Sequence, residues 1–481
     1  MVFGSITEIA NGDHYPARGL AAWVTQRGAA LRAMGVRRGD RVLIAHGGSA
    51  AFFVDLMAVW HAGGCAGCLD PELTADELAN IVRFVGPRLI LGAKQVVGGF
   101  PNHPRFAPPS ARISGSHTPG SLFGALAADD PALILFTSGT TGTPKGVVHS
   151  AGALGARLAA NRRRIPPAAL ERTLCVLPTH FGHGLIGNCL TPLSAGGNLC
   201  LFTSPGLGGI GKMGALIDAH RIGFMSSVPA FWKIALRASP HPREGTLRRV
   251  HIGSAPLSGK LWRAVCGWTQ GATVCNVYGI TETANWVAGA CSDEFEPEDG
   301  LVGPMWNGEA RVRSDSGRVT GSGEGEILLR TAGQMLGYCR RDGLDPEPPR
   351  DAWYATGDRG RIDAGGAIRL TGRLKSEINR AGVKVLPEEV DRLVESHPEV
   401  VAACSFGLPD EVIGEMVAIA VQLRDSVLDP AQLAAWCAGR LRREWVPERW
   451  FVVDAIPTTE RGKYNRDLVR RYCLKVNESS T

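Results

Sequence analysis

A loop rich in glycine and hydroxyl side chains contains the residues of this chain that could do chemistry most directly. Its sequence is Thr137-Ser138-Gly139-Thr140-Thr141-Gly142-Thr143-Pro144-Lys145, followed by Gly146. Glycines let backbone N–H groups approach an anion closely, while the hydroxyls add donors and Lys145 adds a positive charge. Apolar residues 133–136 before the loop predict a short buried strand, and a second strand is expected from 146 onward. The loop is therefore expected to hold the phosphates of a nucleoside triphosphate.

Two other interpretations of this loop compete with the nucleotide site. A Walker A loop needs the pattern G-x-x-x-x-G-K-[ST] at the start of a helix, but here Lys145 lies between Pro144 and Gly146, so the spacing fails. An ordinary surface loop is the usual explanation for clusters of Gly, Thr and Pro. Other motifs must decide between the surface loop and the nucleotide site.

Length and charge limit the class of protein. The chain has 481 residues, whereas a single hydrophobic core stops growing near ~250–300 residues, so two or more domains are expected. The net charge is +6 and the Lys and Arg residues are mostly dispersed, which gives no support for a nucleic-acid partner. The first 16 residues lack a signal-peptide pattern and no apolar stretch has membrane-spanning length. We therefore expect no membrane span and a cytoplasmic location.

Twelve cysteines are scattered along the chain, and Cys65 and Cys68 have the spacing of a redox or zinc motif. A zinc site would need a second pair at similar spacing, which the sequence does not offer. The segment 56–69 instead has the pattern of a buried helix that leads into a strand. We expect both cysteines to be small apolar residues of the core.

Alternating apolar patterns predict the elements that position the loop. In the first part of the chain, helix and strand patterns follow one another. The expected helices cover 20–34, 51–61 and 74–84, and the expected strands cover 41–45, 65–69 and 89–91. Such alternation implies sheets covered by helices.

The pattern changes further along the chain. Short, glycine-rich β-type segments at about 302–370 predict a smaller β-rich subdomain, and an α+β pattern returns after 372. There, the expected helices cover 387–396 and 430–445, and the expected strands cover 400–408, 417–423 and 450–453. We therefore expect an α/β fold with a large N-terminal domain of helix-covered sheets plus the β subdomain, 1–374, and a smaller, mobile α+β C-terminal domain, 375–481.

Four further segments contain residues suited to nucleotide chemistry. They are Tyr278-Gly279-Ile280-Thr281-Glu282-Thr283, Tyr354-Ala355-Thr356-Gly357-Asp358, Gly372-Arg373-Leu374-Lys375 and Pro457-Thr458-Thr459-Glu460-Arg461-Gly462-Lys463. With the phosphate loop, and in this order, they resemble the motifs of the adenylate-forming superfamily of acyl-CoA synthetases, peptide-synthetase adenylation domains and luciferases. The resemblance covers nearly the whole chain, from Gly35 to Lys463. It implies an ATP-dependent carboxylic acid ligase that forms an acyl adenylate, releases pyrophosphate and then forms a thioester.

The resemblance also implies how ATP and Mg²⁺ are held. Because a carboxylate and the α-phosphate are both anions, positive charge and a metal must offset their repulsion. Glu282 is expected to bind Mg²⁺ and Thr281 to contact the α-phosphate, whereas a lone loop glutamate is ordinarily only solvated. Asp358 is expected to accept hydrogen bonds from the ribose with Arg373 beside it, the alternative being a surface salt bridge between the two.

Further residues are expected around the nucleotide from the same resemblance. At the β- and γ-phosphates these are Thr137, Ser138, Gly139, Thr140, Thr141, Gly142 and Lys145, and around the adenine they are Gly253, Ser254, Ala255, Pro256, Asn276, Tyr278 and Gly279. A tyrosine stacks well on a purine.

Three positions in the last part of the chain are assigned through the family. Lys463 is expected to catalyse adenylation by reaching the carboxylate and the α-phosphate, while the alternative is an ordinary lysine on a flexible loop. Lys375 takes the place of the hinge between the two domains. Rotation there would move Lys463 out and bring in a segment with Gly382, which is expected to line a tunnel for the pantetheine thiol.

The segment Leu177-Pro178-Thr179-His180-Phe181-Gly182-His183-Gly184 resembles the motif that gates the acyl pocket. The expected pocket residues are His180, Phe181, Gly182, His183, Val228 and Ile280. Peptide-synthetase domains that select α-amino acids commonly have Asp at the position of Gly182, so an α-amino acid is not expected. The expected pocket walls are mostly apolar, which favours an aryl or a short to medium aliphatic acid. The two histidines either hydrogen-bond a hydroxylated or anionic acyl group or are packed loop residues.

The thiol acceptor is open between coenzyme A and the phosphopantetheine of a carrier protein acting in trans, since no carrier domain follows Lys463. The other function considered is a catalytically silent homologue that binds nucleotide or acyl adenylate. Intact Lys463, Glu282, Asp358 and Arg373 argue against a silent homologue.

Overall fold

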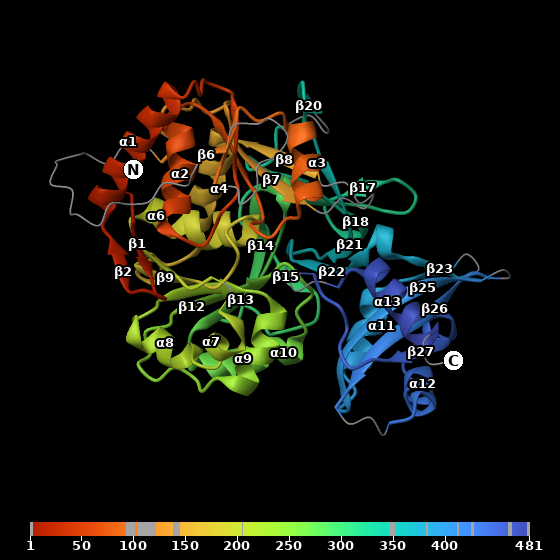
Figure 1. Cartoon of the computed structure of the whole chain (residues 1–481). Helices are drawn as coiled ribbons and strands as arrows, with labels where there is room; N and C mark the ends of the chain where they lie inside the picture. Colours follow the sequence, from red (N-terminus) through yellow and green to blue (C-terminus); the bar gives the residue numbers. More distant parts are fainter. Residues whose placement is uncertain are drawn as a thin grey trace.

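The structure is a computed structural model of the chain. It describes residues 3–92, 122–137, 145–203, 205–345, 352–380, 383–410, 413–424, 428–459 and 464–478, and the backbone of 102–103. In these residues the strands form four sheets, and Figure 1 shows the fourth sheet with its helices set to one side of the other three.

The first sheet carries the strands on either side of the phosphate loop. Its eight strands follow the order β20-β19-β8-β7-β4-β3-β5-β6. The strands are β3 (Arg41–Ile44), β4 (Cys65–Cys68), β5 (Leu89–Leu91), β6 (Asn102–His103), β7 (Pro131–Thr137), β8 (Lys145–Ser150), β19 (Gly337–Arg340) and β20 (Gly343–Asp345). Strands β5, β3, β4 and β7 run parallel, whereas β8 returns antiparallel to β7. This is the strand–helix alternation that the sequence predicts.

The helices of this part are α1 (Ala17–Ala33), α2 (Ala50–His61), α3 (Ala75–Val85) and α4 (Ala151–Arg164). Local signals explain their limits. Thr74 and Glu77 form a capping box before α3, and Gly86 ends that helix in the left-handed region, with φ 58°. Helix α2 is apolar on all sides and is buried from Ala50 to Trp60, so it belongs to the core rather than to the surface.

The second sheet carries the segments expected at the adenine and the acyl group. Its order is β14-β13-β12-β11-β9-β10-β1-β2. The strands are β1 (Ser5–Glu8), β2 (Asp13–Tyr15), β9 (Arg172–Cys175), β10 (Asn198–Leu201), β11 (Phe224–Ser227), β12 (Arg249–Gly253), β13 (Thr273–Ile280) and β14 (Asn285–Cys291). A disulfide joins Cys275 and Cys291, which face each other across β13 and β14.

Helices surround this second sheet. They are α5 (Pro167–Leu170), the π-helix η1 (His183–Leu190), α6 (Thr191–Ala195), α7 (Gly206–Ile210), α8 (Met213–Ala219), α9 (Pro229–Ala238) and α10 (Gly259–Thr269), and the 3₁₀ turn η2 (Thr281–Thr283) follows β13. Figure 1 shows α7 to α10 gathered on one side of this sheet. One hydrophobic core includes α2 and runs between both large sheets.

The third sheet forms the expected β subdomain. Its order is β15-β22-β21-β18-β16-β17, with β15 (Leu301–Gly303), β16 (Glu309–Arg313), β17 (Val319–Thr320), β18 (Gly323–Arg330), β21 (Tyr354–Ile362) and β22 (Ile368–Arg373). The hairpin of β19 and β20 departs from the expectation. It pairs with β8 of the first sheet although its sequence lies within 302–370.

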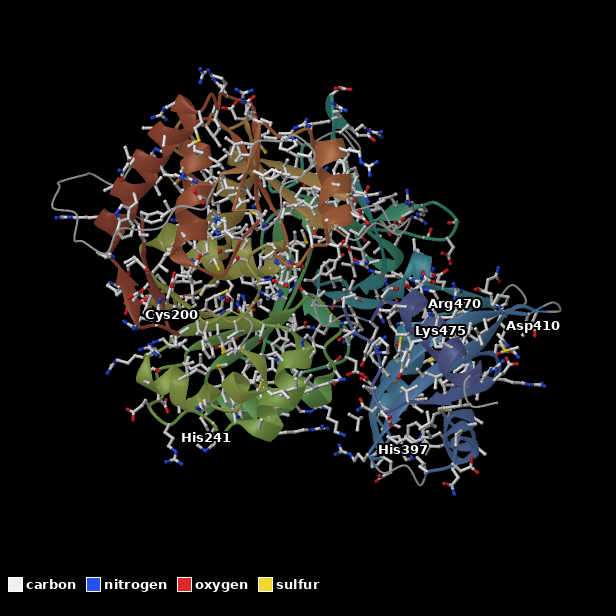
Figure 2. All side chains as sticks on the ribbon, viewed as in Figure 1. Cys200, His241, His397, Asp410, Arg470 and Lys475 are labelled. Atoms are coloured by element: carbon white, nitrogen blue, oxygen red, sulfur yellow. A yellow bond between two sulfur atoms is a disulfide. The ribbon has the colours of Figure 1, made fainter. Side chains whose placement is uncertain are left out.

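The fourth sheet and its helices form the last part of the chain. The elements are the 3₁₀ turn η3 (Leu374–Ser376), β23 (Ile378–Arg380), β24 (Val383–Val385), α11 (Pro387–Glu395), β25 (Val400–Asp410), β26 (Gly414–Leu423), α12 (Pro430–Ala438), the 3₁₀ turn η4 (Arg443–Trp445), β27 (Arg449–Val452) and α13 (Arg466–Glu478). The expected helix 430–445 was too long, because α12 stops before Gly439. Helix α13 was not predicted; Figure 2 labels Arg470 and Lys475 on it.

The expectations for Cys65 and Cys68 and for membrane-spanning segments can be compared with the structure. Cys65 and Cys68 are free and buried within β4, as predicted for core cysteines. In the part of the chain that the structure describes, none of the helices is both long enough and apolar enough to cross a membrane.

Candidate active site

The two ends of the phosphate loop are held opposite each other by the first sheet. Thr137, the last residue of β7, pairs with Lys145, the first residue of β8. The ammonium nitrogen Nζ of Lys145 lies 4.8 Å from the centre of the Tyr338 ring, a cation–π contact. Residues Ser138, Gly139, Thr140, Thr141 and Gly142 lie outside the described residues, so their expected phosphate contacts stay predictions.

Tyr338 also reaches the expected metal ligand. Its hydroxyl donates to Glu282 Oε1 at 3.1 Å and lies 3.0 Å from the hydroxyl of Tyr354. Burial raises the pKa of Tyr354, and the Glu282 carboxylate raises it further, so this phenol stays neutral and able to donate. Lys145 and Glu282 therefore meet on one aromatic side chain, which the sequence reasoning missed because β19 was expected in another sheet.

Glu282 and Thr281 form a short 3₁₀ turn directly after β13. The carboxylate of Glu282 suits a hard cation, and the hydrogen bond that it accepts from Tyr338 comes from a neutral phenol. Among the described residues, no three His, Cys, Asp or Glu side chains are grouped for a metal. Mg²⁺ is commonly held by one or two carboxylates together with substrate phosphates, so Glu282 fits a magnesium ion that arrives with ATP.

Asp358 is the expected ribose ligand, and two neighbouring side chains hold its carboxylate. Its carboxylate accepts from Tyr278 Oη at 2.6 Å and from Arg373 Nε at 2.7 Å, and the residue is only 4% exposed. Strand pairing places Asp358 opposite Arg373. Burial raises the pKa of Tyr278, and Asp358 raises it further. The carboxylate of Asp358 is therefore buried and has both a phenol and a guanidinium as partners. It differs from a surface salt bridge, in which both partners are exposed.

The expected adenine segments lie at neighbouring strand ends. Gly253 ends β12, and a Cβ there would lie 2.7 Å from the Val277 carbonyl oxygen, so only glycine fits. Ser254 follows with φ 68°, while Ala255 and Pro256 continue the loop. Asn276 is buried in β13 and donates to the Leu301 carbonyl at 2.7 Å.

The acyl segment contains a histidine with both ring nitrogens engaged. His183 Nδ1 lies 2.7 Å from Ser254 Oγ, and Nε2 lies 2.5 Å from Ser226 Oγ. Because Ser226 Oγ donates to the His251 carbonyl at 3.2 Å, it accepts from Nε2–H of His183. His183 therefore connects the expected acyl segment to the expected adenine segment through Ser254, and it also contacts Ser226, which no local pattern indicates.

Among the other expected pocket residues, Phe181 has its ring centre 6.4 Å from that of His183. Phe181 and Val228 are buried and Ile280 is half-buried. His180 Nε2 lies 3.4 Å from the Asp70 carboxylate. A Cβ at Gly182 would lie 3.3 Å from Leu135 Cδ1 and 4.0 Å from Asn285 Cβ, so this position lies between one apolar and one polar side chain.

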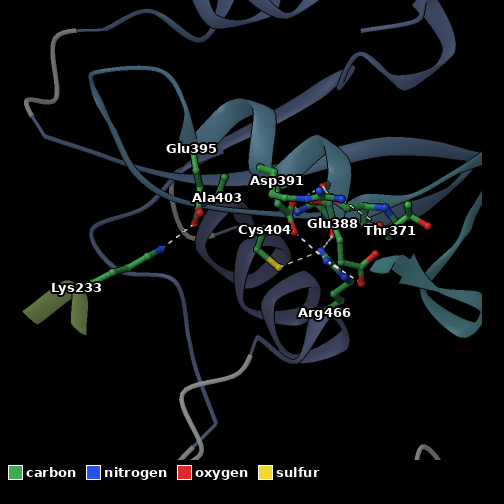
Figure 3. A network of polar contacts seen from close by, with 11 residues as sticks. Lys233, Thr371, Glu388, Asp391, Glu395, Ala403, Cys404 and Arg466 are labelled. Atoms are coloured by element: carbon green, nitrogen blue, oxygen red, sulfur yellow. Dashed lines mark hydrogen bonds and ion pairs between the residues drawn. The ribbon is translucent and has the colours of Figure 1, made fainter. Parts of the chain in front are cut away.

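The segments expected to move are partly outside the described residues. Gly382 and Lys463 are among those left out, as is the side chain of Lys375, whose backbone lies in η3. Arg466, which follows Lys463 closely, is held by α11. Its Nη2 lies 2.8 Å from Asp391 Oδ2 and 3.2 Å from Glu388 Oε1 (Figure 3).

The chain belongs to the AMP-binding enzyme family. The family model for AMP-binding enzymes matches residues 9–339, and the model for the C-terminal domain of these enzymes matches 389–463. The predicted α/β fold and the predicted class, an AMP-forming acid–thiol ligase that makes an acyl adenylate and then a thioester, are confirmed.

Relatives and solved structures cover nearly the whole chain. It is 28% identical over 471 residues to an oxalate–CoA ligase of Arabidopsis thaliana, which covers 92% of this chain and 90% of that protein. It is 29% identical over 451 residues to a feruloyl-CoA synthase of an Amycolatopsis species, again covering 92% and 90%. ATP-bound MatB from Rhodopseudomonas palustris superposes with a TM-score of 0.83 at 26% identity, covering 97% of this chain and 95% of that one.

Proposed function

We propose that this ligase activates an aryl or a short to medium aliphatic acid and transfers the acyl group to coenzyme A. The observation that best supports this proposal is that Tyr338 contacts both Lys145 and Glu282. Lys145 is the last residue of the phosphate loop. Asp358, in the strand that begins with Tyr354, adds a buried carboxylate. Three chain segments thus supply a cation, a metal-type oxygen and a ribose-type acceptor in one region.

In the proposed reaction, Asp358 accepts hydrogen bonds from the ribose while Lys145 and the phosphate loop bind the β- and γ-phosphates. Glu282 would hold Mg²⁺, which when bound neutralises phosphate charge. A carboxylate oxygen of the acid attacks the α-phosphorus, and the bond from that phosphorus to the pyrophosphate oxygen breaks. In the second step the thiol sulfur, having lost its proton to solvent, attacks the acyl carbon, and AMP leaves with the electrons of the broken C–O bond.

The domain boundary near 374 and 375, with Lys375 as hinge, is part of the same proposal. It is supported by the change of sheet between β22, which ends at Arg373, and β23, which begins at Ile378. Figure 1 shows β23 pointing away from the large sheets. Lys463 as the catalyst of adenylation and Gly382 as a tunnel residue also remain proposals.

Two observations support the choice of acid and acceptor. Position 182 is a glycine, so it offers no carboxylate that could pair with the ammonium group of an α-amino acid. The relatives named above are described as CoA ligases. A peptide synthase of Bacillus subtilis is also similar, at 26% identity over 427 residues and 18% of its length, so a carrier protein in trans is the second acceptor to test. The cytoplasmic location stays a prediction.

The test is a panel assay with purified enzyme and Mg·ATP. Pyrophosphate release is measured with aryl, aliphatic, hydroxy and α-amino acids in the presence of hydroxylamine, and thioester formation is then measured with coenzyme A. We expect release with aryl or short to medium aliphatic acids and a CoA thioester of the same acid. Release with α-amino acids alone would contradict the assigned acid class. If the enzyme binds ATP but releases no pyrophosphate with any acid, the result would favour the silent homologue.

A further inference from the structure

The backbone is strained directly after the turn that carries Thr281 and Glu282. Just after it, Ala284 has φ 54° and Asn285 has φ 78°, although neither residue is glycine. Non-glycine residues in this region persist only where the surrounding structure determines the conformation. Something outside the turn must therefore hold it.

Three consecutive carbonyl groups of the turn are held by three different elements. The Thr281 carbonyl accepts from His149 Nε2 at 2.8 Å, and the Glu282 carbonyl accepts from the Met335 amide at 2.8 Å. The Thr283 carbonyl lies 3.3 Å from Arg157 Nη2. Two of the three donors, His149 and Arg157, are basic side chains, and we call this pair the basic support.

Both members of the basic support are fully buried. Burial lowers the pKa of His149 to about 4, so the ring is neutral and donates its single N–H to the turn. Burial also lowers the pKa of Arg157 to about 10, which leaves the guanidinium charged at neutral pH. A buried charge is costly unless its surroundings compensate it, so a specific use is expected.

Arg157 has few partners for a buried arginine. Its Nη2 also donates to Thr331 Oγ1 at 3.1 Å, while Nε and Nη1 have no hydrogen-bond partner within the described part of the chain. In the same residues no carboxylate forms an ion pair with it. A Cβ at Gly333 would lie 3.2 Å from Arg157 Nη2 and 3.0 Å from the Thr283 carbonyl oxygen. Glycine there lets the guanidinium reach the turn.

The basic support is continuous with the phosphate loop. Strand β8 begins at Lys145, passes His149 and ends at Ser150. Ser150 is also the N-cap of α4, because its hydroxyl accepts from the Ala153 amide at 3.1 Å, and α4 carries Arg157. One strand–helix segment therefore holds the phosphate-binding lysine at its start and the strained turn further along.

We propose that Arg157, together with His149, is a positioning residue that sets Thr281 and Glu282 at the distance from Lys145 that Mg·ATP requires. This inference rests on the proposed function, in which Glu282 binds the metal and Thr281 meets the α-phosphate. Neither member of the basic support is required to touch substrate. Partners that orient a metal ligand typically contribute 10- to 100-fold to metal affinity or activity, so an effect of about that size is expected here.

The experiment measures Mn²⁺ binding to the complex of the enzyme with α,β-methylene-ATP, an analogue that cannot release pyrophosphate. Mn²⁺ replaces Mg²⁺ because electron paramagnetic resonance detects it directly. The variants are Arg157→Met, Arg157→Lys and Thr331→Val, with Glu282→Gln as the test of the metal ligand itself. Arg162→Met is the matched control, because Arg162 lies in the same helix but donates to the Ser194 carbonyl, at 2.7 Å.

We expect Arg157→Met to weaken Mn²⁺ binding about 10-fold or more, Arg157→Lys to recover part of the loss, and Arg162→Met to change nothing. Thr331→Val leaves the guanidinium in place and removes one of its partners, so it covers the case in which Arg157→Met fails to fold; a smaller loss is expected. If only Glu282→Gln weakens binding, Arg157 is merely structural and the inference is overturned. If Glu282→Gln also has no effect, the metal assignment of the proposed function fails, and the inference fails with it.

Discussion

Replacing Asp358 with asparagine tests the assigned nucleotide site most directly. The side chain is 5% exposed, and its two oxygens each accept one protein hydrogen bond, from Tyr278 Oη at 2.6 Å and from Arg373 Nε at 2.7 Å. A carboxylate has about four lone-pair positions, so two remain for the ribose hydroxyls. The asparagine has the same shape, but it keeps only one acceptor oxygen.

The size of the effect follows from the lost acceptor. Hydrogen bonds to charged groups contribute about 1.5–3 kcal/mol each, and each 1.4 kcal/mol corresponds to a factor of ten. Losing one such bond to the ribose should lower kcat/KM for ATP about 10- to 100-fold. If the missing contact is made equally in the ground state and the transition state, the loss should appear as a higher KM for ATP with kcat unchanged.

The assay compares pyrophosphate release from ATP, 2′-deoxy-ATP and 3′-deoxy-ATP at a saturating level of the best acid. The wild-type enzyme should prefer ATP, and Asp358→Asn should remove most of that preference. Asp315→Asn is a suitable control, because Asp315 is 69% exposed and pairs with Arg359. If the folded Asp358→Asn variant discriminates between the three nucleotides as the wild type does, Asp358 does not bind the ribose.

Three further outcomes are expected. Lowering the pH from 6.5 to 4 should destabilise the protein by up to ~3 kcal/mol through His149, whose pKa falls to about 4 on folding, because the unfolded chain then binds a proton that the folded chain does not. The fall in melting temperature over this range should be shallower in His149→Gln, and an equal fall would refute it. Lys233 Nζ lies 3.1 Å from Glu395 Oε1 on α11 (Figure 3); since both groups are partly exposed, Lys233→Ala should change the ratio of the adenylation and thioester rates by about 5-fold at most, and a Glu395→Gln background should remove the change. Replacing Cys275 and Cys291 together by alanine should cost about 3 kcal/mol by the chain-entropy model, and an unchanged melting temperature would contradict a stabilising disulfide.

Local patterns predicted the strand before the phosphate loop and a helix further upstream well. The strand at 133–136 corresponds to β7, Pro131–Thr137, and the helix expected at 74–84 corresponds to α3, Ala75–Val85. Both are set by short-range signals: a continuous apolar run, and a capping box with a C-terminal glycine. Hydrogen bonds within one segment follow from that segment's own sequence.

Long-range pairing was what the sequence could not indicate. Tyr338 lies in a stretch expected in the β subdomain, yet β19 pairs with β8, and this pairing brings the tyrosine to Lys145 and Glu282. The link from His183 to Ser226 likewise joins two segments that are 43 residues apart. Such contacts depend on which strands become neighbours, and the period of an apolar pattern gives only the face of each strand.

Strand β13 explains why the proposed ribose site and the proposed metal site should respond together. Its register with β14 shifts between Tyr278 and Gly279, where β14 has one extra residue, and pairing then continues to Ile280, just before Thr281 and Glu282. A Cβ at Gly279 would lie 1.9 Å from the Asn285 carbonyl oxygen, so only glycine allows the bulge to close against β14. Tyr278 on one side of the bulge hydrogen-bonds Asp358, and Glu282 on the other side accepts from Tyr338. Because one short segment carries both Tyr278 and Glu282, a disturbance of the turn should reach a nucleotide bound at these proposed sites through its ribose as well as through its phosphates.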